Sequence, residues 1–148
     1  MKKIFLMLTL VLLSISVFSQ ETVRELLDQG VNQITRKNYK KAIELFDKAI
    51  AMDNGDQELY AHRGQAKHYL GLYQEAILDY NKAIQLEPDY AEVYHLRGLA
   101  KAELKDMNGA CEDWEKSYEK GEKRAMELLI EFCKDYLDND GSTVKPKK

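Results

Sequence analysis

Apolar residues recur along this 148-residue chain in blocks with the spacing of amphipathic helices, and short polar breaks separate the blocks. The blocks begin in six places, near Thr22, Tyr39, Asp56, Tyr73, Tyr90 and Met107. Within each successive pair of blocks the break is short, as in Arg36-Lys37-Asn38, Gly71-Leu72 and Lys105-Asp106. The pattern therefore predicts three pairs of helices of three to four turns each, and an all-α fold.

The chain also repeats itself at intervals of 34 residues. Three kinds of position recur at this interval: Gly30, Gly64 and Gly98; Ala42, Ala76 and Ala110; Phe46, Tyr80 and Trp114. A period of this size indicates units that are each too small to bury their own apolar face and must stack. Because a glycine within a helix costs about 1 kcal/mol relative to alanine, its recurrence predicts a close helix crossing beside the aromatic ring.

This pattern resembles the tetratricopeptide repeat (TPR) family. Residues 57–90 match the family's pattern at Tyr60, Gly64, Gly71, Tyr73, Ala76, Tyr80, Ala83 and Pro88. Residues 91–124 keep Tyr94, Gly98, Ala110 and Trp114 but depart at Met107, Ser117 and Glu122. Residues 23–56 are looser, with Leu26 in place of the aromatic residue and Asn54 in place of the proline. The resemblance implies a right-handed helical solenoid of three helix-turn-helix repeats, 23–56, 57–90 and 91–124.

The two ends of the chain have different characters. Lys2 and Lys3 precede an apolar run from Ile4 to Phe18, which is typical of a secretory signal peptide, so residues 1–20 are expected to be removed. The alternative is an uncleaved membrane anchor, although the run is shorter than the roughly 20 residues that span a bilayer. The folded domain is then residues 21–137, and Thr22 and Glu25 form a predicted capping box at its start.

After the third repeat, residues 123–137 are predicted to form one more amphipathic helix, which would cap the apolar end of the array. The polar residues 138–148 are predicted to be a disordered tail. Removal of a segment with two lysines and no acidic residue would change the formal charge from −3 to −5, and no basic stripe is present. Nucleic acid is therefore not an expected partner.

The chain contains no motif that indicates a catalytic site or a cofactor site, and we expect no enzymatic activity. All three histidines fall on the first helix of a repeat, and His62 and His68 would project about 120° apart, which does not suit a shared metal ion. No metal is expected.

In TPR proteins with known partners, peptides or helices lie in the concave groove formed by the first helix of each repeat. The resemblance implies ten groove residues here: Glu58, His62, Gln65, His68, Tyr69, Glu92, His95, Leu96, Leu99 and Glu103. Ala61 and His62, then His95 and Leu96, stand where some family members clamp a terminal carboxylate, so a C-terminal acidic peptide is not the implied ligand. Leu96 and Leu99 favour a protein or peptide partner with aliphatic or aromatic anchors.

We therefore predict an exported, non-enzymatic protein-protein interaction module, monomeric by itself, in the periplasm or at the outer membrane of a Gram-negative bacterium, or secreted. After cleavage no membrane span would remain. The alternative is a structural subunit buried in a larger envelope assembly, with no free groove.

Two further pairings are predicted. Arg63 and Arg97 share one repeat position, Asp79 and Asp113 share another, and the first repeat lacks both charges, which indicates Arg–Asp pairs between paired helices. Export and an even cysteine count favour a disulfide between Cys111 and Cys133, because antiparallel packing brings their two regions level. The alternative is a pair of buried thiols that act as small apolar groups.

Overall fold

The computed structural model describes residues 21–137. The predicted signal peptide, residues 1–20, and the predicted disordered tail, residues 138–148, lie outside the described residues. Seven α-helices and one 3-10 helix follow one another in the described range: α2 (Val23–Thr35), α3 (Tyr39–Met52), α4 (Gln57–Tyr69), α5 (Tyr73–Leu86), α6 (Ala91–Glu103), α7 (Met107–Glu119), α8 (Arg124–Phe132) and η1 (Lys134–Tyr136). The six predicted helices of the repeats are all present, each within about a residue of its expected start.

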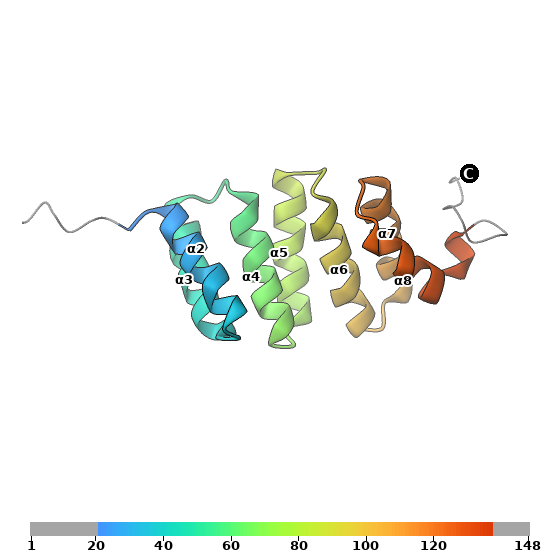
Figure 1. The fold of residues 1–148 in the computed structure, drawn as a ribbon, viewed down its shortest axis with the longest axis horizontal. Coiled ribbons are helices and arrows are strands. Elements are labelled where there is room, and N and C mark those ends of the chain that lie inside the picture. Colours follow the sequence, from blue (N-terminus) through green and yellow to red (C-terminus); the bar gives the residue numbers. More distant parts are fainter. Residues whose placement is uncertain (1–20, 138–148) are drawn as a thin grey trace, which may run out of the picture.

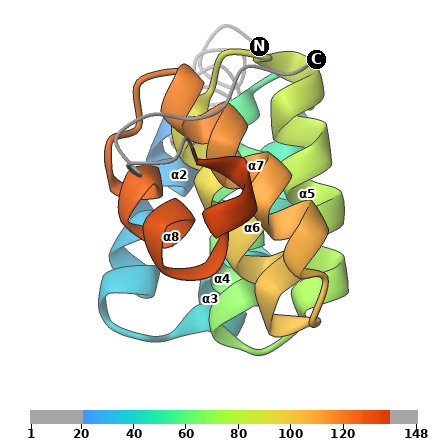
Figure 2. The same cartoon turned by 90° about the vertical axis from the view of Figure 1, so that its right-hand side faces the viewer.

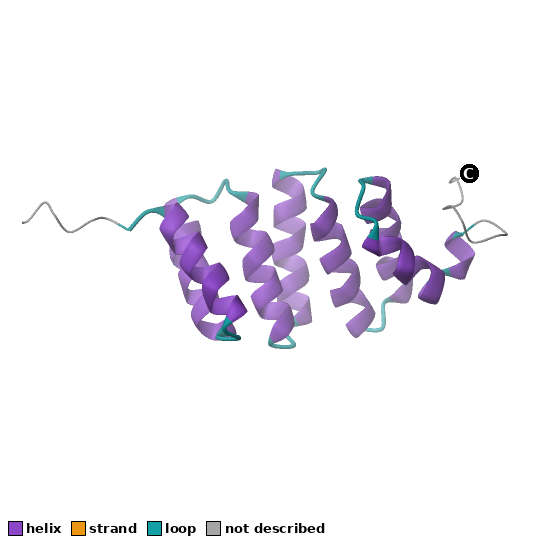
Figure 3. Cartoon of the chain, viewed as in Figure 1, coloured by secondary structure: helices purple, strands orange, loops and turns teal. Residues whose placement is uncertain are grey.

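The helices form two layers of an elongated array (Figure 1). We call α2, α4 and α6 the A helices and α3, α5 and α7 the B helices. Each A helix packs against the B helix of its own repeat, α4 and α6 also pack against the preceding B helix, and neighbouring A helices touch. The turns that join A to B lie along one long edge of the array, and the loops that join B to the next A lie along the other (Figure 3). The fold is an all-α helical repeat.

The repeated glycines allow the two layers to approach each other closely. A Cβ atom on Gly64 would lie 2.7 Å from Cε1 of Tyr80, and Cβ atoms on Gly30 and Gly98 would likewise overlap the rings of Phe46 and Trp114. These three rings are at most 1% exposed. The predicted close crossing is confirmed, because the ring of each B helix occupies the space that a side chain on the A helix would need.

Hydrogen bonds cap the first turn of α2, which is the first helix of the array. The Thr22 hydroxyl accepts a hydrogen bond from the Glu25 amide, and the Thr22 amide donates to the Glu25 carboxylate at 2.8 Å. This reciprocal pair confirms the predicted capping box and satisfies two donors that the first turn of α2 would leave unpaired.

The C-terminal end differs from the single helix predicted over residues 123–137. α8 ends at Phe132, and η1 follows a non-helical residue, Cys133. Ala125, Leu129, Cys133 and Leu137 are all buried. In a straight helix four such residues would turn about 120° from first to last, because each four-residue step overshoots a full turn by roughly 40°. The break at Cys133 returns Leu137 to the core, and α8 with η1 covers the end of the array (Figure 2).

None of the helices within residues 21–137 combines the length and the apolar character that crossing a bilayer requires.

Candidate partner-binding groove

The ten residues implied for the groove lie on the two central A helices, five on α4 and five on α6. Most are partly exposed. The structure does not gather them into one pocket. It distributes them over a small hollow, an aromatic cluster and a larger apolar pocket, which we describe in that order along the A-helix layer.

The small hollow lies between the first halves of α4 and α6 and has a volume of about 50 Å³. It is lined by Ala61, His62, Gln65, Tyr90, Glu92, Val93 and Leu96. The His62 ring stacks on Phe46, with the centroids 6.0 Å apart. Two exposed ion pairs at 3.8 Å, Arg24–Glu58 and Arg124–Glu92, join the A-helix layer along this side. Such exposed pairs contribute at most about 1 kcal/mol each to stability, so they hold the rim of the hollow only weakly.

The aromatic cluster lies where α4 ends. Tyr69 stacks on Tyr39 with the ring centroids 4.9 Å apart, and His68 meets Tyr73 edge-on at 5.2 Å. Burial lowers the pKa of His68, with Glu103 acting in the opposite direction, and its Nδ1 atom is buried without a hydrogen-bond partner in the described part of the chain. His68 is therefore held neutral at pH 7. Sequence reasoning missed Tyr39, although Tyr39 and Tyr73 occupy the same repeat position.

The larger pocket has a volume of about 460 Å³ and lies between the end of α6, the start of α7 and α8. It is lined by Leu99, Ala102, Glu103, Lys105, Met107, Trp114, Leu128 and Phe132. Phe132 is 52% exposed, although it lies beside the Trp114 ring at a centroid distance of 6.2 Å. A mostly apolar hollow with two charged residues in its lining suits an aliphatic or aromatic side chain of a partner.

Only Leu99 and Glu103 of this pocket were implied by the sequence. The sequence interpretation placed Trp114 in the core and treated residues 123–137 as a cover. The missed signal is the spacing of Leu128 and Phe132, which are four residues apart and off the buried stripe of Ala125, Leu129 and Cys133.

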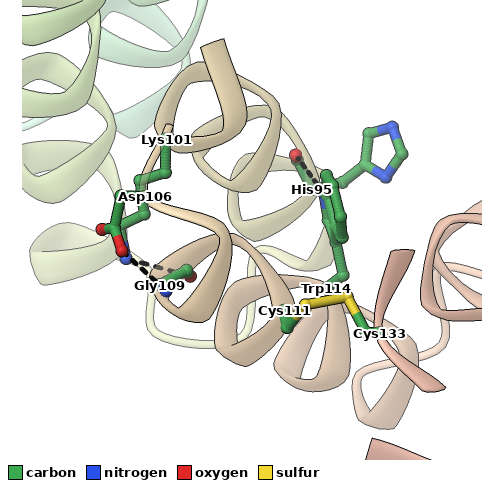
Figure 4. The surroundings of a disulfide bond; sticks show 7 residues. All are labelled: His95, Lys101, Asp106, Gly109, Cys111, Trp114 and Cys133. Carbon is green, nitrogen blue, oxygen red and sulfur yellow. Dashed lines mark hydrogen bonds between the residues drawn. A yellow bond between two sulfur atoms is a disulfide. The ribbon is translucent and has the colours of Figure 1, made fainter. Parts of the chain in front are cut away.

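A disulfide holds the wall that α8 contributes to this pocket. Cys111 of α7 and Cys133 at the end of α8 are bonded, with their Cα atoms 5.7 Å apart, within the range that disulfide geometry allows. The bond lies beside Trp114, whose indole N–H donates to the His95 carbonyl at 3.3 Å (Figure 4). Burial lowers the pKa of His95, and Arg124 lowers it further, against the opposing effect of Glu122 and Glu92.

Two ion triads, each centred on a buried aspartate, lie between the two layers. Asp79 accepts two hydrogen bonds from Arg63, at 2.9 and 2.6 Å, and pairs with Lys67 at 2.9 Å. The next repeat copies this arrangement with Asp113, Arg97 and Lys101. The predicted Arg–Asp pairs are confirmed. The sequence interpretation missed the lysines, each of which lies one helical turn after its arginine.

In the range 21–137, no group of three or more histidine, cysteine, aspartate or glutamate side chains is arranged to hold a metal ion.

Comparison with known proteins agrees with this architecture. A family model described as TPR repeat matches residues 64–105. The chain is similar to the second TPR domain of the human RPAP3 protein, solved in complex with the HSP70 peptide SGPTIEEVD, with 31% identity and a TM-score of 0.67 over 71% of this chain and 89% of that one. It is also similar to MamA, with 26% identity and a TM-score of 0.73 over 78% of this chain and 68% of that one.

A third structure shares the fold. The type III secretion translocator chaperone SycD of Yersinia enterocolitica has 16% identity and a TM-score of 0.68, covering 80% of this chain and 92% of its own. No curated protein sequence matches the chain. With its repeated glycines packed on repeated aromatic rings and these structural relatives, the chain belongs to the TPR repeat family.

Proposed function

We propose that this protein is a non-enzymatic interaction module that binds a segment of a partner protein along its A-helix layer, with an apolar side chain of that segment in the pocket between α6, α7 and α8. The observation that carries the proposal is the pocket itself, because its two leucines, Met107 and Phe132 leave apolar surface in contact with solvent, and a bound partner would cover it. Partner segments with aliphatic or aromatic anchors match such a site.

Structural relatives support peptide binding of this general kind. The second TPR domain of human RPAP3 was solved with an HSP70 peptide, and the second TPR domain of the protein Spaghetti (RPAP3) was solved with an HSP90 peptide. Both peptides end in EEVD. We expect this chain to prefer a different ligand from those peptides. Ala61 and His62 occupy two of the positions where a carboxylate clamp would need cationic or amide groups. Ala61 is 4% exposed, and the His62 ring stacks on Phe46. We therefore expect the partner segment to be recognised by apolar anchors rather than by a terminal carboxylate.

The test is site-specific photo-crosslinking in the organism of origin. A photoreactive residue at Glu103, in the pocket lining, or at the exposed Tyr69 should capture the same partner. The same residue at Leu78, which is 67% exposed on α5 in the other layer, is the matched control and should not capture it. Capture from Leu78 alone would contradict the groove proposal.

A second experiment isolates the pocket. Leu128→Asp should abolish crosslinking from Glu103, because a carboxylate in the pocket wall loses hydration when an apolar anchor covers it. Circular dichroism and the sedimentation of the variant report whether the array remains folded and monomeric. A chain that is folded only as part of a larger assembly would instead favour the structural-subunit alternative.

Export to the cell envelope is part of the proposal, supported by the two lysines and the apolar run in residues 1–20. Intact-mass measurement of the protein from fractionated cells tests it. We expect a chain that begins near Gln20 or Glu21 in the periplasmic or outer-membrane fraction, and a full-length chain in the inner membrane would contradict export.

A further inference from the structure

The turn between α2 and α3 carries an unusual concentration of positive charge. Arg36, Lys37, Lys40 and Lys41 lie within six residues and are all exposed, although the whole chain has a formal charge of −3. Within residues 21–137 the ion pairs of this group comprise one contact, between Lys41 and Glu44 at 2.9 Å. We call residues 36–41 the basic turn.

The basic turn surrounds a hollow. Its volume is about 410 Å³, and it is lined by Lys37, Asn38, Tyr39, Lys40, Lys41 and Leu70. Leu70 belongs to the next A-to-B turn, so the hollow bridges the first two repeats. Beside it lie the stacked rings of Tyr39 and Tyr69, and Leu72 is 40% exposed in the same turn as Leu70. Cationic and apolar groups therefore meet at one place on this edge.

The fold does not require these cations. At the four equivalent positions the second repeat has Leu70, Gly71, Gln74 and Glu75, and the third has Leu104, Lys105, Asn108 and Gly109. The three turns nevertheless share a backbone, since the second residue of each is left-handed, with φ of 61°, 76° and 67° for Lys37, Gly71 and Lys105. Lysine is less suited than glycine to this conformation, so Lys37 and Lys105 both adopt a backbone geometry that favours glycine.

Charge is also divided between the two long edges of the array. The loops between B and A helices carry Asp53, Asp56, Glu87 and Asp89, on the edge opposite the basic turn (Figure 3). Of these, Asp89 pairs with Lys120 at 2.6 Å. The third such loop carries Lys120 and Lys123 with Glu122, so the acidic excess of that edge belongs to the first two loops. The basic turn lies on the other edge and presents its positive charge to an anionic partner there.

We propose that the basic turn is a second docking site, which adjoins the aromatic cluster of the groove and takes an acidic segment of a partner protein. Carboxylates of the segment meet Lys37 and Lys40, and an apolar residue packs on Leu70 and Leu72. We favour a protein segment over an anionic membrane because the cations surround a hollow, which single side chains can enter and the flat surface of a bilayer cannot.

The test measures the binding of a fluorescein-labelled decaglutamate peptide to the purified protein by fluorescence anisotropy. We expect saturable binding that weakens as the salt concentration rises from about 50 to about 200 mM. Lys37→Glu with Lys40→Glu should weaken it at least about tenfold. The matched control, Lys48→Glu with Lys134→Glu, changes net charge equally at two exposed lysines outside the hollow and should leave binding within about twofold.

Each alternative has its own outcome. Equal weakening by both double variants would reduce the effect to net charge and overturn the proposal. Binding to phosphatidylglycerol vesicles without binding to decaglutamate would assign the turn to a membrane surface instead. Salt-sensitive self-association in sedimentation velocity, lost in the Lys37→Glu, Lys40→Glu variant, would make the acidic edge of a second copy the occupant and also overturn it.

Discussion

The first repeat and the two that follow it fold alike but are held together by different chemistry. In the second and third repeats the layers are joined by an aspartate, 4% exposed at Asp79 and 1% at Asp113, that pairs with an arginine and a lysine. At the equivalent position the first repeat has Leu45, which packs in an apolar cluster. The helix pair forms in both cases, so its geometry depends on the glycine and the ring that all three repeats share.

The difference also affects how the repeats connect. Arg63 reaches back to Asp47 of the preceding repeat at 2.6 Å, and Arg97 reaches Asn81 in the same way. The first repeat has Gln29 at this position, and Gln29 donates to Glu21 at 2.8 Å. Arg63 and Arg97 therefore link the triad of their own repeat to the B helix of the preceding one, whereas Gln29 makes no such link within residues 21–137.

The largest expected effect comes from breaking a triad. Asp113→Ala leaves the partly buried cations of Arg97 and Lys101 without their carboxylate, which should lower the free energy of unfolding by about 3–5 kcal/mol. Urea denaturation followed by circular dichroism measures it. Copying the first repeat into the third, with Arg97→Gln, Lys101→Gln and Asp113→Leu together, should recover most of the loss. A triple variant as unstable as Asp113→Ala would show that the triad has a role that apolar contact cannot replace.

The second effect concerns the C-terminal end of the array. There a disulfide ties the last helix to α7, whereas a capping box stabilises the first helix at the N-terminal end. Replacing both Cys111 and Cys133 by serine should lower the free energy of unfolding by about 3 kcal/mol, because the bond closes a loop with a sequence separation of 22. Thiol titration of the unfolded, non-reduced protein comes first. Two free thiols in freshly isolated protein would show that the cap is held by packing alone.

A smaller effect is expected where all three repeats agree. Gly64→Leu forces a side chain into the space of the Tyr80 ring and should cost about 1–3 kcal/mol or more. The change in unfolding free energy is compared with that of Ala51→Leu, at an exposed position of α3. An unchanged melting temperature for Gly64→Leu would refute the close packing of the layers.

The turns allow a stabilising test. Lys37→Gly should raise the free energy of unfolding by about 1 kcal/mol. The substitution removes a lysine from a left-handed backbone conformation and gives the first turn the same residue as the second turn has at Gly71. The same variant should weaken decaglutamate binding if Lys37 serves the basic turn. A loss of stability would mean that the Lys37 side chain contributes to the fold.

The smallest effect is a pH dependence that comes from the second and third repeats alone. Burial lowers the pKa of His68 and of His95 below the ordinary 6.5, so the unfolded chain binds more protons and stability falls as the pH drops below about 6.5. The carboxylates with a lowered pKa, such as Glu122 at about 2, act only below their ordinary 4.5. The free energy of unfolding measured in urea should therefore be lower at about pH 5.5 than at about pH 7.5. The double variant His68→Gln with His95→Gln should reduce this difference.

Much of the fold could be predicted because each packing pattern occurs three times in the sequence. Every repeat has a glycine on its first helix and an aromatic residue at the same distance along the chain on its second helix, which indicates a contact between the two. The joint appearance of Arg63 and Asp79 indicated another contact. The candidate site was harder to predict. Its residues on α4 and α6 follow from the period, but the pocket beside them takes Leu128 and Phe132 from outside the three repeats, where no second copy exists for comparison.

The sequence by itself determined the helix pairs, their order and the contacts between paired layers, because these depend on residues at short and regular separations. Only the tertiary structure decided where α8 ends, that Phe132 stays exposed beside Trp114, and that Leu70 completes a hollow around the cations of the preceding repeat. These features depend on how surfaces from different repeats meet. The angle between one repeat and the next is a property of the packed array, and no local pattern of apolar residues encodes it.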